Sequence, residues 1–219
     1  MTLQDMRRNY QRGSLHEADV ASDPMMQFDA WFKAIAAERA TGRTPDWFEP
    51  NAMTLATATP EGVPSARIVL LKGYDGRHFT FFTNYASQKG SELTANPQAE
   101  LCFFWAPLER QVRVHGRVAR LPRAESAAYF CTRPRGSQLG ACVSQQSATI
   151  ADRSVLEDHL RELEKRYAGG DVPMPETWGG FALTPEHVEF WQGQPNRLHD
   201  RLRYSRQADG AWKIERLAP

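Results

Sequence analysis

The chain has 219 residues, of which 41% are hydrophobic and 24% charged, a mixture typical of an ordinary globular protein rather than a disordered or membrane chain. The formal net charge is +1, from 27 basic and 26 acidic side chains, and gives no reason to expect a nucleic acid as partner. Any recognition of phosphate must therefore come from local clusters of arginine and lysine.

The cysteines and the hydropathy bear on the compartment. There are three cysteines, without C-x-x-C spacing, so neither a zinc site nor a disulfide framework is expected. We expect buried thiols in a reducing compartment. No stretch approaches the roughly 18 apolar residues of a membrane span. The prediction is a cytoplasmic protein without a membrane-spanning segment or bound metal. The cysteines are Cys102, Cys131 and Cys142.

The chain begins with a polar stretch and an amphipathic helix. Residues 1–20 are predicted to be a mobile segment until something orders them. Asp23 followed by Pro24 is typical of an N-cap and the first position of a helix, which should end before Gly42. Short strands separated by turn signals follow. They are expected at 53–58, 66–72, 78–83, 100–105 and 111–119.

Helices interrupt the strands, and the chain closes with strands again. Helices are expected from Ser87 to Thr94, over 123–132 before Pro134, and from a capping box at 154–157 to Gly169. The closing strands are expected at 181–183, 188–191, 201–204 and 212–216. Consecutive strands with hairpin-like links favour an antiparallel sheet or barrel. We predict an α+β fold, mainly antiparallel with flanking helices, and one domain over 21–219.

A cation stands at each end of one apolar strand, with Arg67 before it and Lys72 after it. A buried strand carries charge only where the charge is paired. Strand parity predicts that the two side chains point to opposite faces, toward different partners or different parts of one large ligand. The simpler interpretation of this segment alone is that both lie at solvated strand ends.

Two further segments are candidate anion sites. Segment 83–89 leads from a strand into a helix whose first turn holds a hydroxyl and a lysine, and such an N-terminus favours phosphate. Tyr129 and Arg133 are neighbours on one helical face, and Ser137 follows a proline bend, placed to cap the next helix. These three groups suit a phosphate monoester. An ordinary capping serine and solvated arginines are the alternatives.

A row of basic groups follows Trp191. If the chain there is extended, Arg197, His199 and Arg201 share one strand face. Cationic groups on one face repel one another unless an anionic or electron-rich ligand lies across them. The row therefore predicts a ligand site with Trp191 as an aromatic wall.

Together these segments resemble the pyridoxamine 5'-phosphate oxidase family in order, from about residue 7 to the end of the chain. The motifs are RIVLLK, FFTNYASQKG, ERQVRVHG, YFCTRPRGSQ, SQQS, EFWQGQPNRLHDR and the closing WKIERLAP. The resemblance implies a split β-barrel homodimer with FMN bound at the subunit interface. It also implies hydride transfer from C4' of pyridoxamine or pyridoxine 5'-phosphate to the flavin. Pyridoxal 5'-phosphate results, O2 is converted to H2O2, and the amine releases ammonia.

The resemblance assigns residues to each ligand. To FMN it assigns Arg67, Ile68, Val69, Leu70, Leu71, Lys72, Phe82, Thr83, Gln88, Lys89, Gln111, Gln146, Ser147, Trp191 and Arg201. To substrate it assigns Arg7, Arg8, Tyr10, Lys72, Tyr129, Arg133, Ser137, Arg197 and His199. Arg197 and His199 would lie at the pyridine ring and the reacting carbon as catalytic residues. Arg7, Arg8 and Tyr10 would belong to an N-terminal segment that closes over the site.

One position departs from the family pattern, and three other functions compete. Gln88 stands where many members have arginine, so we expect somewhat weaker binding of FMN. A phenazine-pathway flavin oxidase would share the barrel, but should lack the substrate-phosphate set just named. A non-catalytic protein that stores FMN or pyridoxal phosphate is distinguished by turnover. A nucleic-acid-binding barrel is disfavoured by the neutral net charge.

Overall fold

The computed structural model describes residues 2–6 and 9–219. The helices are α1 (Pro24–Ala40), α2 (Gln88–Ala95), α3 (Arg123–Thr132), α4 (Arg135–Val143) and α5 (Ser154–Arg166), with 3-10 turns η1 (Leu3–Asp5), η2 (Glu17–Asp19), η3 (Ala106–Leu108) and η4 (Pro195–Arg197). The strands are β1 (Ala52–Ala58), β2 (Pro64–Leu70), β3 (Gly73–Tyr74), β4 (Phe79–Asn84), β5 (Gln98–Trp105), β6 (Arg110–Arg120), β7 (Trp178–Gln192), β8 (Asp200–Arg206) and β9 (Trp212–Arg216).

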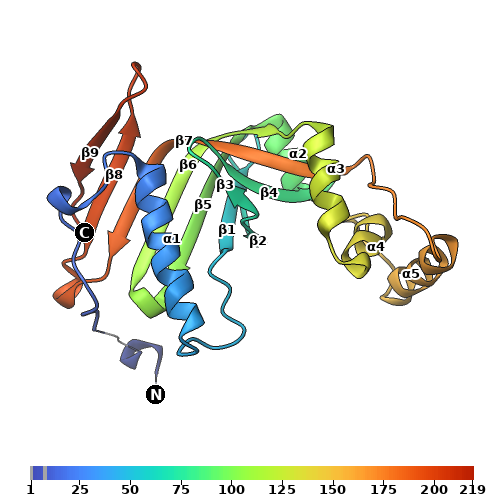
Figure 1. The fold of residues 1–219 in the computed structure, drawn as a ribbon, viewed down its shortest axis with the longest axis horizontal. Helices are drawn as coiled ribbons and strands as arrows, with labels where there is room; N and C mark the ends of the chain where they lie inside the picture. The colour runs from blue at the N-terminus through green and yellow to red at the C-terminus, as the bar shows by residue number, and fades with distance from the viewer. Residues whose placement is uncertain (1, 7–8) are drawn as a thin grey trace.

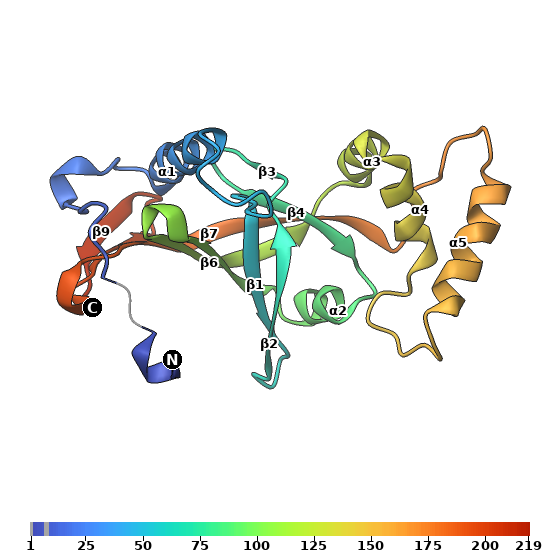
Figure 2. The same cartoon turned by 90° about the horizontal axis from the view of Figure 1, so that it is seen from below.

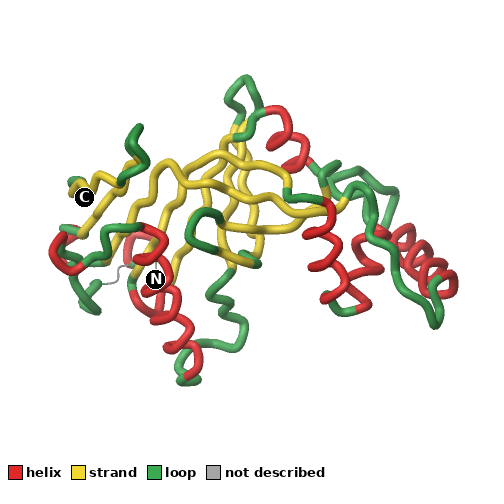
Figure 3. The backbone as a smooth tube through the Cα atoms, turned by 45° about the horizontal axis from the view of Figure 1, so that its top comes forward, coloured by secondary structure: helices red, strands yellow, loops and turns green. Residues whose placement is uncertain are grey.

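The strands form one antiparallel sheet, which confirms the expected fold class. The order is β2-β1-β5-β6-β7-β4-β3, and β8 pairs with both β7 and β9. Figure 1 shows β5, β6 and β7 running through the centre of the molecule, and Figure 3 shows the strands gathered between helices at both ends.

Strand β7 is continuous over 15 residues, whereas two short strands were expected at 181–183 and 188–191. The first half of β7 pairs with β4 and its second half with β8. Strand β6 pairs with β7 along the whole length of β6, from Arg110 to Arg120. A register shift after His115 lets the ladder continue past Pro185. A Cβ at Gly116 would lie 2.0 Å from the Thr184 carbonyl oxygen, so this crossing requires glycine.

Helix α1 covers the main core as its sequence predicts. Asp23 caps it by accepting the Met25 N–H at 2.6 Å, and its apolar face buries Phe28, Trp31 and Ile35. The Phe28 ring meets Phe79 edge to face, with centroids 4.8 Å apart. Aromatic burial of this kind fixes α1 against the sheet.

Helices α3, α4 and α5 gather around a second apolar cluster, and Figure 2 shows them at one end of an elongated molecule, away from α1. The cluster includes Phe130, Leu139 and Leu163. The proposed capping box was wrong, because α5 begins at Ser154 itself and Asp152 accepts the Ser154 N–H at 2.7 Å. Ser137 was also wrongly predicted to cap α4. Pro134 occupies the N-cap position, so Ser137 lies inside the first turn of the helix.

The thiols are less buried than expected. Cys131 is exposed, and Cys102 and Cys142 are partly buried; all three are free. Among the residues that the structure describes, no helix is long and apolar enough to cross a membrane. The same residues contain no cluster of three acidic, histidine or cysteine side chains that could hold a metal ion.

Candidate functional site

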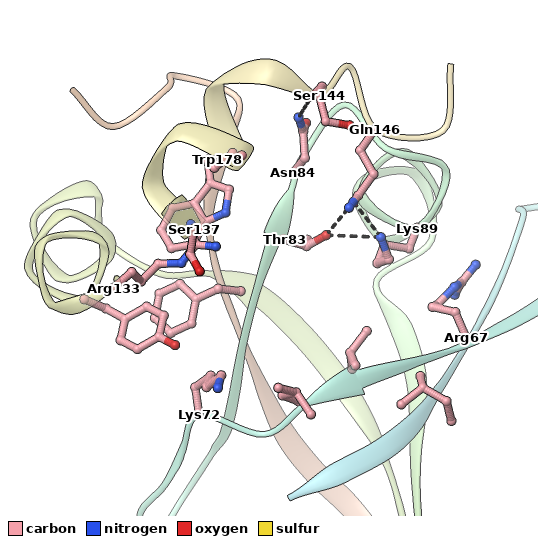
Figure 4. Close-up of a pocket in the computed structure, with 17 residues that line it drawn as sticks. Arg67, Lys72, Thr83, Asn84, Lys89, Arg133, Ser137, Ser144, Gln146 and Trp178 are labelled. Atoms are coloured by element: carbon pink, nitrogen blue, oxygen red, sulfur yellow. Dashed lines mark hydrogen bonds between the residues drawn. The ribbon is translucent and has the colours of Figure 1, made fainter. Parts of the chain in front are cut away.

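A pocket of about 480 Å³ lies between strands β2 and β4 on one side and helices α3 and α4 on the other. It is lined by Arg67, Ile68, Val69, Leu70, Lys72, Phe82, Thr83, Asn84, Lys89, Tyr129, Arg133, Ser137, Gly140, Ala141, Ser144, Gln146 and Trp178. Most side chains assigned above from two distant parts of the sequence therefore share one cavity. In Figure 4, Arg67 and Lys89 lie at one end of this pocket, and Lys72 and Arg133 at the other.

Arg67 is held in place by a buried carboxylate, Glu92. The Arg67 Nη2 lies 3.3 Å from Glu92 Oε2, which also accepts hydrogen bonds from the hydroxyls of Thr57 and Ser65. Burial raises the pKa of Glu92, but the hydrogen bonds from Ser65, Thr57, Gln88 and Arg67 outweigh it and lower the pKa to about 2. Glu92 is therefore ionised and fixes the direction of the Arg67 guanidinium.

Lys89 points into the same end of the pocket. Its Nζ donates to Gln146 Oε1 at 2.8 Å and to Thr83 Oγ1 at 3.2 Å (Figure 4). Desolvation, and then the positive charge of Arg67, lower the pKa of Lys89. The attraction of an anion bound between the two cations would offset both effects, so this end of the pocket suits a phosphate.

The other end is aromatic and carries Arg133. The Phe82 ring stacks on Tyr129, at a centroid distance of 4.0 Å, and on Trp178, at 5.3 Å. The Arg133 guanidinium lies 4.8 Å from the Trp178 ring centroid. Its Nη1 is buried and has no hydrogen-bond acceptor among the described residues. Desolvation lowers the pKa of Arg133, as expected of a cation lacking an anionic partner.

The parity argument for Arg67 and Lys72 does not apply, because Lys72 lies beyond the end of strand β2. Strand β2 ends at Leu70, and Leu71 is buried in the core with 4% of its surface exposed. The alternation of faces does not extend beyond the strand. Arg67 and Lys72 line opposite ends of one pocket, which is compatible with the expectation that they serve different parts of one large ligand. Leu71 itself, assigned to FMN by resemblance, contributes no side chain to it.

Gln88 and Ser147 line an adjoining cavity at the start of α2. The Gln88 side-chain amide donates to Glu92 Oε1 at 2.9 Å, and the Gln88 backbone N–H donates to Ser147 Oγ at 3.2 Å. Gln88 thus contacts Glu92, the carboxylate that orients Arg67. Ser147 adopts a positive φ of 75°, a backbone conformation uncommon for residues other than glycine.

Arg197 and His199 lie in a different cavity, of about 500 Å³, together with Tyr10. The expected row on one strand face was wrong, because Asn196 and Arg197 have positive φ angles of 56° and 62° and β8 begins only at Asp200. Arg201 instead pairs with Glu189 through two hydrogen bonds of 2.9 and 3.1 Å. Arg7 and Arg8 lie outside the described residues.

His199 has a defined hydrogen-bond pattern. Its Nδ1 accepts the Gln194 backbone N–H at 3.1 Å, so in the neutral ring Nε2 carries the proton. Desolvation, and then Arg197, lower the pKa of His199 from 6.5. The side chain is therefore a neutral Nε2–H donor at pH 7. The Trp191 ring lies beside it, at a centroid distance of 4.6 Å.

Three polar or aromatic pocket residues were missed by sequence reasoning: Asn84, Ser144 and Trp178. Asn84 directly follows the strand predicted at 78–83, which was the available signal, and in the structure it donates to the Ser144 carbonyl at 3.4 Å (Figure 4). Trp178 begins β7 three residues before the predicted strand. Gln111 pairs with Trp191 across β6 and β7 and lines neither cavity.

Comparisons with known proteins cover nearly the whole chain. A family model described as pyridoxamine 5'-phosphate oxidase matches residues 45–167, and one described as the pyridoxine 5'-phosphate oxidase C-terminal dimerisation region matches 178–219. Pyridoxine/pyridoxamine 5'-phosphate oxidase 1 of Ralstonia nicotianae is 57% identical over 220 residues, covering 100% of this chain and 99% of the relative. The Burkholderia lata enzyme is 54% identical with the same coverage.

Solved structures agree with the fold. PhzG from Burkholderia lata, in complex with tetrahydrophenazine-1-carboxylic acid, is 31% identical, with a TM-score of 0.85 over 94% of this chain and 98% of that one. A pyridoxamine 5'-phosphate oxidase-related, FMN-binding protein from Nostoc punctiforme is 20% identical, with a TM-score of 0.64 over 84% of this chain and 96% of that one. The expected split β-barrel is confirmed.

Proposed function

Because the chain belongs to the pyridoxamine 5'-phosphate oxidase family, we propose that it oxidises pyridoxamine and pyridoxine 5'-phosphates to pyridoxal 5'-phosphate. O2 accepts the two electrons and two protons to give H2O2, and the amine also consumes water and releases ammonia. One observation carries the proposal: a single pocket has two cationic ends, one at Arg67 and Lys89 and one at Lys72 and Arg133. A cofactor phosphate and a substrate phosphate require two such ends.

FMN is the cofactor, and the residues present fit it. Arg67 and Lys89 would hold its phosphate, while the segment 68–70 lines the pocket between the two ends. The lowered pKa of Lys89 shows a cation that gains from an anionic partner. Bound FMN supplies the two-electron redox chemistry, which leaves the protein to bind and orient the reactants.

The substrate phosphate belongs at the aromatic end. Arg133 brings a buried guanidinium nitrogen without an acceptor, and Tyr129, Ser137 and Lys72 line the same wall. A phosphate oxygen placed there would satisfy that nitrogen. This set also favours a vitamin B6 substrate over a phenazine precursor, as does the higher identity to the vitamin B6 oxidases.

The two cavities explain why a second subunit is needed. Tyr10, Arg197 and His199 share no cavity with the phosphate-binding residues, and β8 and α4 lie toward opposite ends of the molecule (Figure 1). The match to a C-terminal dimerisation region supports a homodimer. In that dimer each FMN lies at the interface, and Gln111, Trp191, Arg201, Arg197 and His199 reach it from the second subunit.

The state of His199 limits its role. The neutral ring can donate a hydrogen bond through Nε2–H. Its Nδ1 already accepts the Gln194 backbone N–H and is not available to the substrate. We therefore assign His199 to holding an electronegative atom of the substrate. Arg197, exposed beside it, would contact the pyridine ring. We also propose that the protein acts in the cytoplasm, because its three cysteines are free, as expected in a reducing compartment.

The visible spectrum of the purified protein tests the function. A flavin spectrum with about one FMN per subunit, bleached anaerobically by pyridoxamine 5'-phosphate, is the expected result. Colourless protein that cannot be reconstituted with FMN would contradict the cofactor. A flavin that this substrate does not bleach would favour a storage protein, and bleaching only by a reduced phenazine precursor would favour a PhzG-like enzyme.

A further inference from the structure

A buried carboxylate lies at the turn between β5 and β6. Glu109 has only 3% of its surface exposed and a left-handed backbone, with φ 56° and ψ 40°. Residues other than glycine keep this conformation where their surroundings require it. The Glu109 carbonyl accepts the Gly193 N–H at 2.8 Å and the Gln192 side-chain amide at 3.2 Å. The turn is thus fastened to the end of β7.

The Glu109 side chain reaches the N-terminal segment. Its Oε2 accepts the backbone N–H of Gln11 at 2.6 Å and that of Arg12 at 2.9 Å. Hydrogen bonds to an ionised acceptor are stronger than those between neutral groups. Two consecutive N–H groups bound to one oxygen also fix the direction of the chain at residues 11 and 12.

Tyr10 directly precedes these anchored residues. Its ring meets Trp191 edge-on at a centroid distance of 5.5 Å and His199 at 5.6 Å. A Cβ at Gly193 would lie 2.6 Å from Tyr10 Cγ, so glycine leaves the space that this ring fills. Tyr10 lines the cavity that also contains Arg197 and His199.

We propose that Glu109 is a positioning residue for substrate: its carboxylate holds Gln11 and Arg12 so that Tyr10 forms one wall of the cavity at His199. The inference rests on the proposed function, which assigns that cavity to substrate. Glu109 acts through the N-terminal segment and lies apart from the pocket that Arg67 and Lys89 line. Its loss should therefore weaken substrate binding and leave FMN binding intact.

The first test is the variant Glu109→Gly, which removes the carboxylate and tolerates the left-handed backbone. Loss of two charge-assisted hydrogen bonds should raise KM for pyridoxine 5'-phosphate about tenfold. Glu109→Gln retains an oxygen that can accept both N–H groups and should restore KM to within about threefold of the parent value. The Kd for FMN should stay within about twofold in both variants.

A double-mutant cycle with Tyr10→Ala tests the route. If Glu109 acts through Tyr10, Glu109→Gly adds little to the KM of Tyr10→Ala. Multiplicative effects on KM would overturn the proposal, as would an unchanged KM or an equal weakening of FMN binding in Glu109→Gly. Glu17→Ala is the matched control, because Glu17 ties the same segment to Arg216, further from Tyr10, and should leave KM unchanged.

Hydrogen exchange gives a measurement that needs no activity. In the FMN-loaded protein, exchange of the Gln11 and Arg12 amides should be slow and should accelerate in Glu109→Gly but not in Glu17→Ala. Unchanged exchange in Glu109→Gly would overturn the anchoring itself. If exchange accelerates while the substrate fails to bleach the flavin of the parent protein, the anchoring holds and the proposed function is what fails.

Discussion

Replacing Arg133 with methionine separates ligand binding from folding stability. In the ligand-free chain the buried Nη1 has no acceptor among the described residues, a state that costs about 1–3 kcal/mol. The guanidinium also contacts the Trp178 ring, which contributes about 0.5–2 kcal/mol. Because these contributions oppose each other and methionine keeps the apolar stem, the free energy of unfolding should change by less than about 1 kcal/mol.

Substrate binding should change far more. Removing a charge-assisted contact to phosphate costs about 2–3 kcal/mol, which corresponds to a rise in KM of about 30- to 150-fold for pyridoxine 5'-phosphate. Unphosphorylated pyridoxine never uses the contact, so its KM should change much less. The assay is steady-state oxidation of both substrates at saturating FMN, with thermal unfolding measured on the same samples.

Arg135 provides the matched control two residues away. Its guanidinium donates to the backbone carbonyls of Tyr167 and Gly170 and does not line the pocket. Arg135→Met should therefore lower stability by about 1 kcal/mol and leave KM unchanged. Equal losses with both substrates in Arg133→Met, or a matching rise of KM in Arg135→Met, would refute the assignment of the substrate phosphate to Arg133.

Three further variants test other parts of the site. Gln88→Arg places a cation beside Glu92, frees Arg67 for the cofactor phosphate and should lower the Kd for FMN about fivefold in fluorescence titration; an unchanged Kd would count against this role. Arg197→Met should reduce kcat/KM while FMN remains bound, and released FMN would show a wrong assignment. The pKa of Glu92 is lowered from 4.5 to about 2, so its stabilisation is complete above pH 4.5 and is lost as the pH falls toward 2. Between these limits Tm should fall more steeply in the parent protein than in Glu92→Gln, and parallel slopes would contradict this coupling.

The sequence predicted the helices whose ends are set by neighbouring residues. Asp23 and Pro24 begin α1, and the range predicted for α3 matches the observed helix, because capping and proline act within a few residues. The continuity of β7 was not predictable, since it depends on β4 and β8, which lie far away in the sequence. Pro185 interrupts the strand propensity of this segment, and it is the pairing with β6 that keeps the strand continuous there.

In the site, too, features set by local sequence were predicted and features set by distant strand pairing were not. Motifs identified most pocket residues. Parity did not apply to Lys72 or Arg197, because the chain there leaves the strand conformation that parity assumes. The partner of Arg201 depends on the register between β7 and β8, which places it beside Glu189. Cross-strand partners of this kind follow from register, which a single sequence does not reveal.

The long β7 also sets the order in which the chain can fold during synthesis. Until residues 178–192 leave the ribosome, β4 has only the two-residue β3 beside it and β6 has one unpaired edge. Unpaired edges recruit other chains, and pairings across such sequence separations form slowly. A fragment ending near residue 167 should therefore aggregate, and the nascent chain should depend on chaperones until its last quarter has been translated.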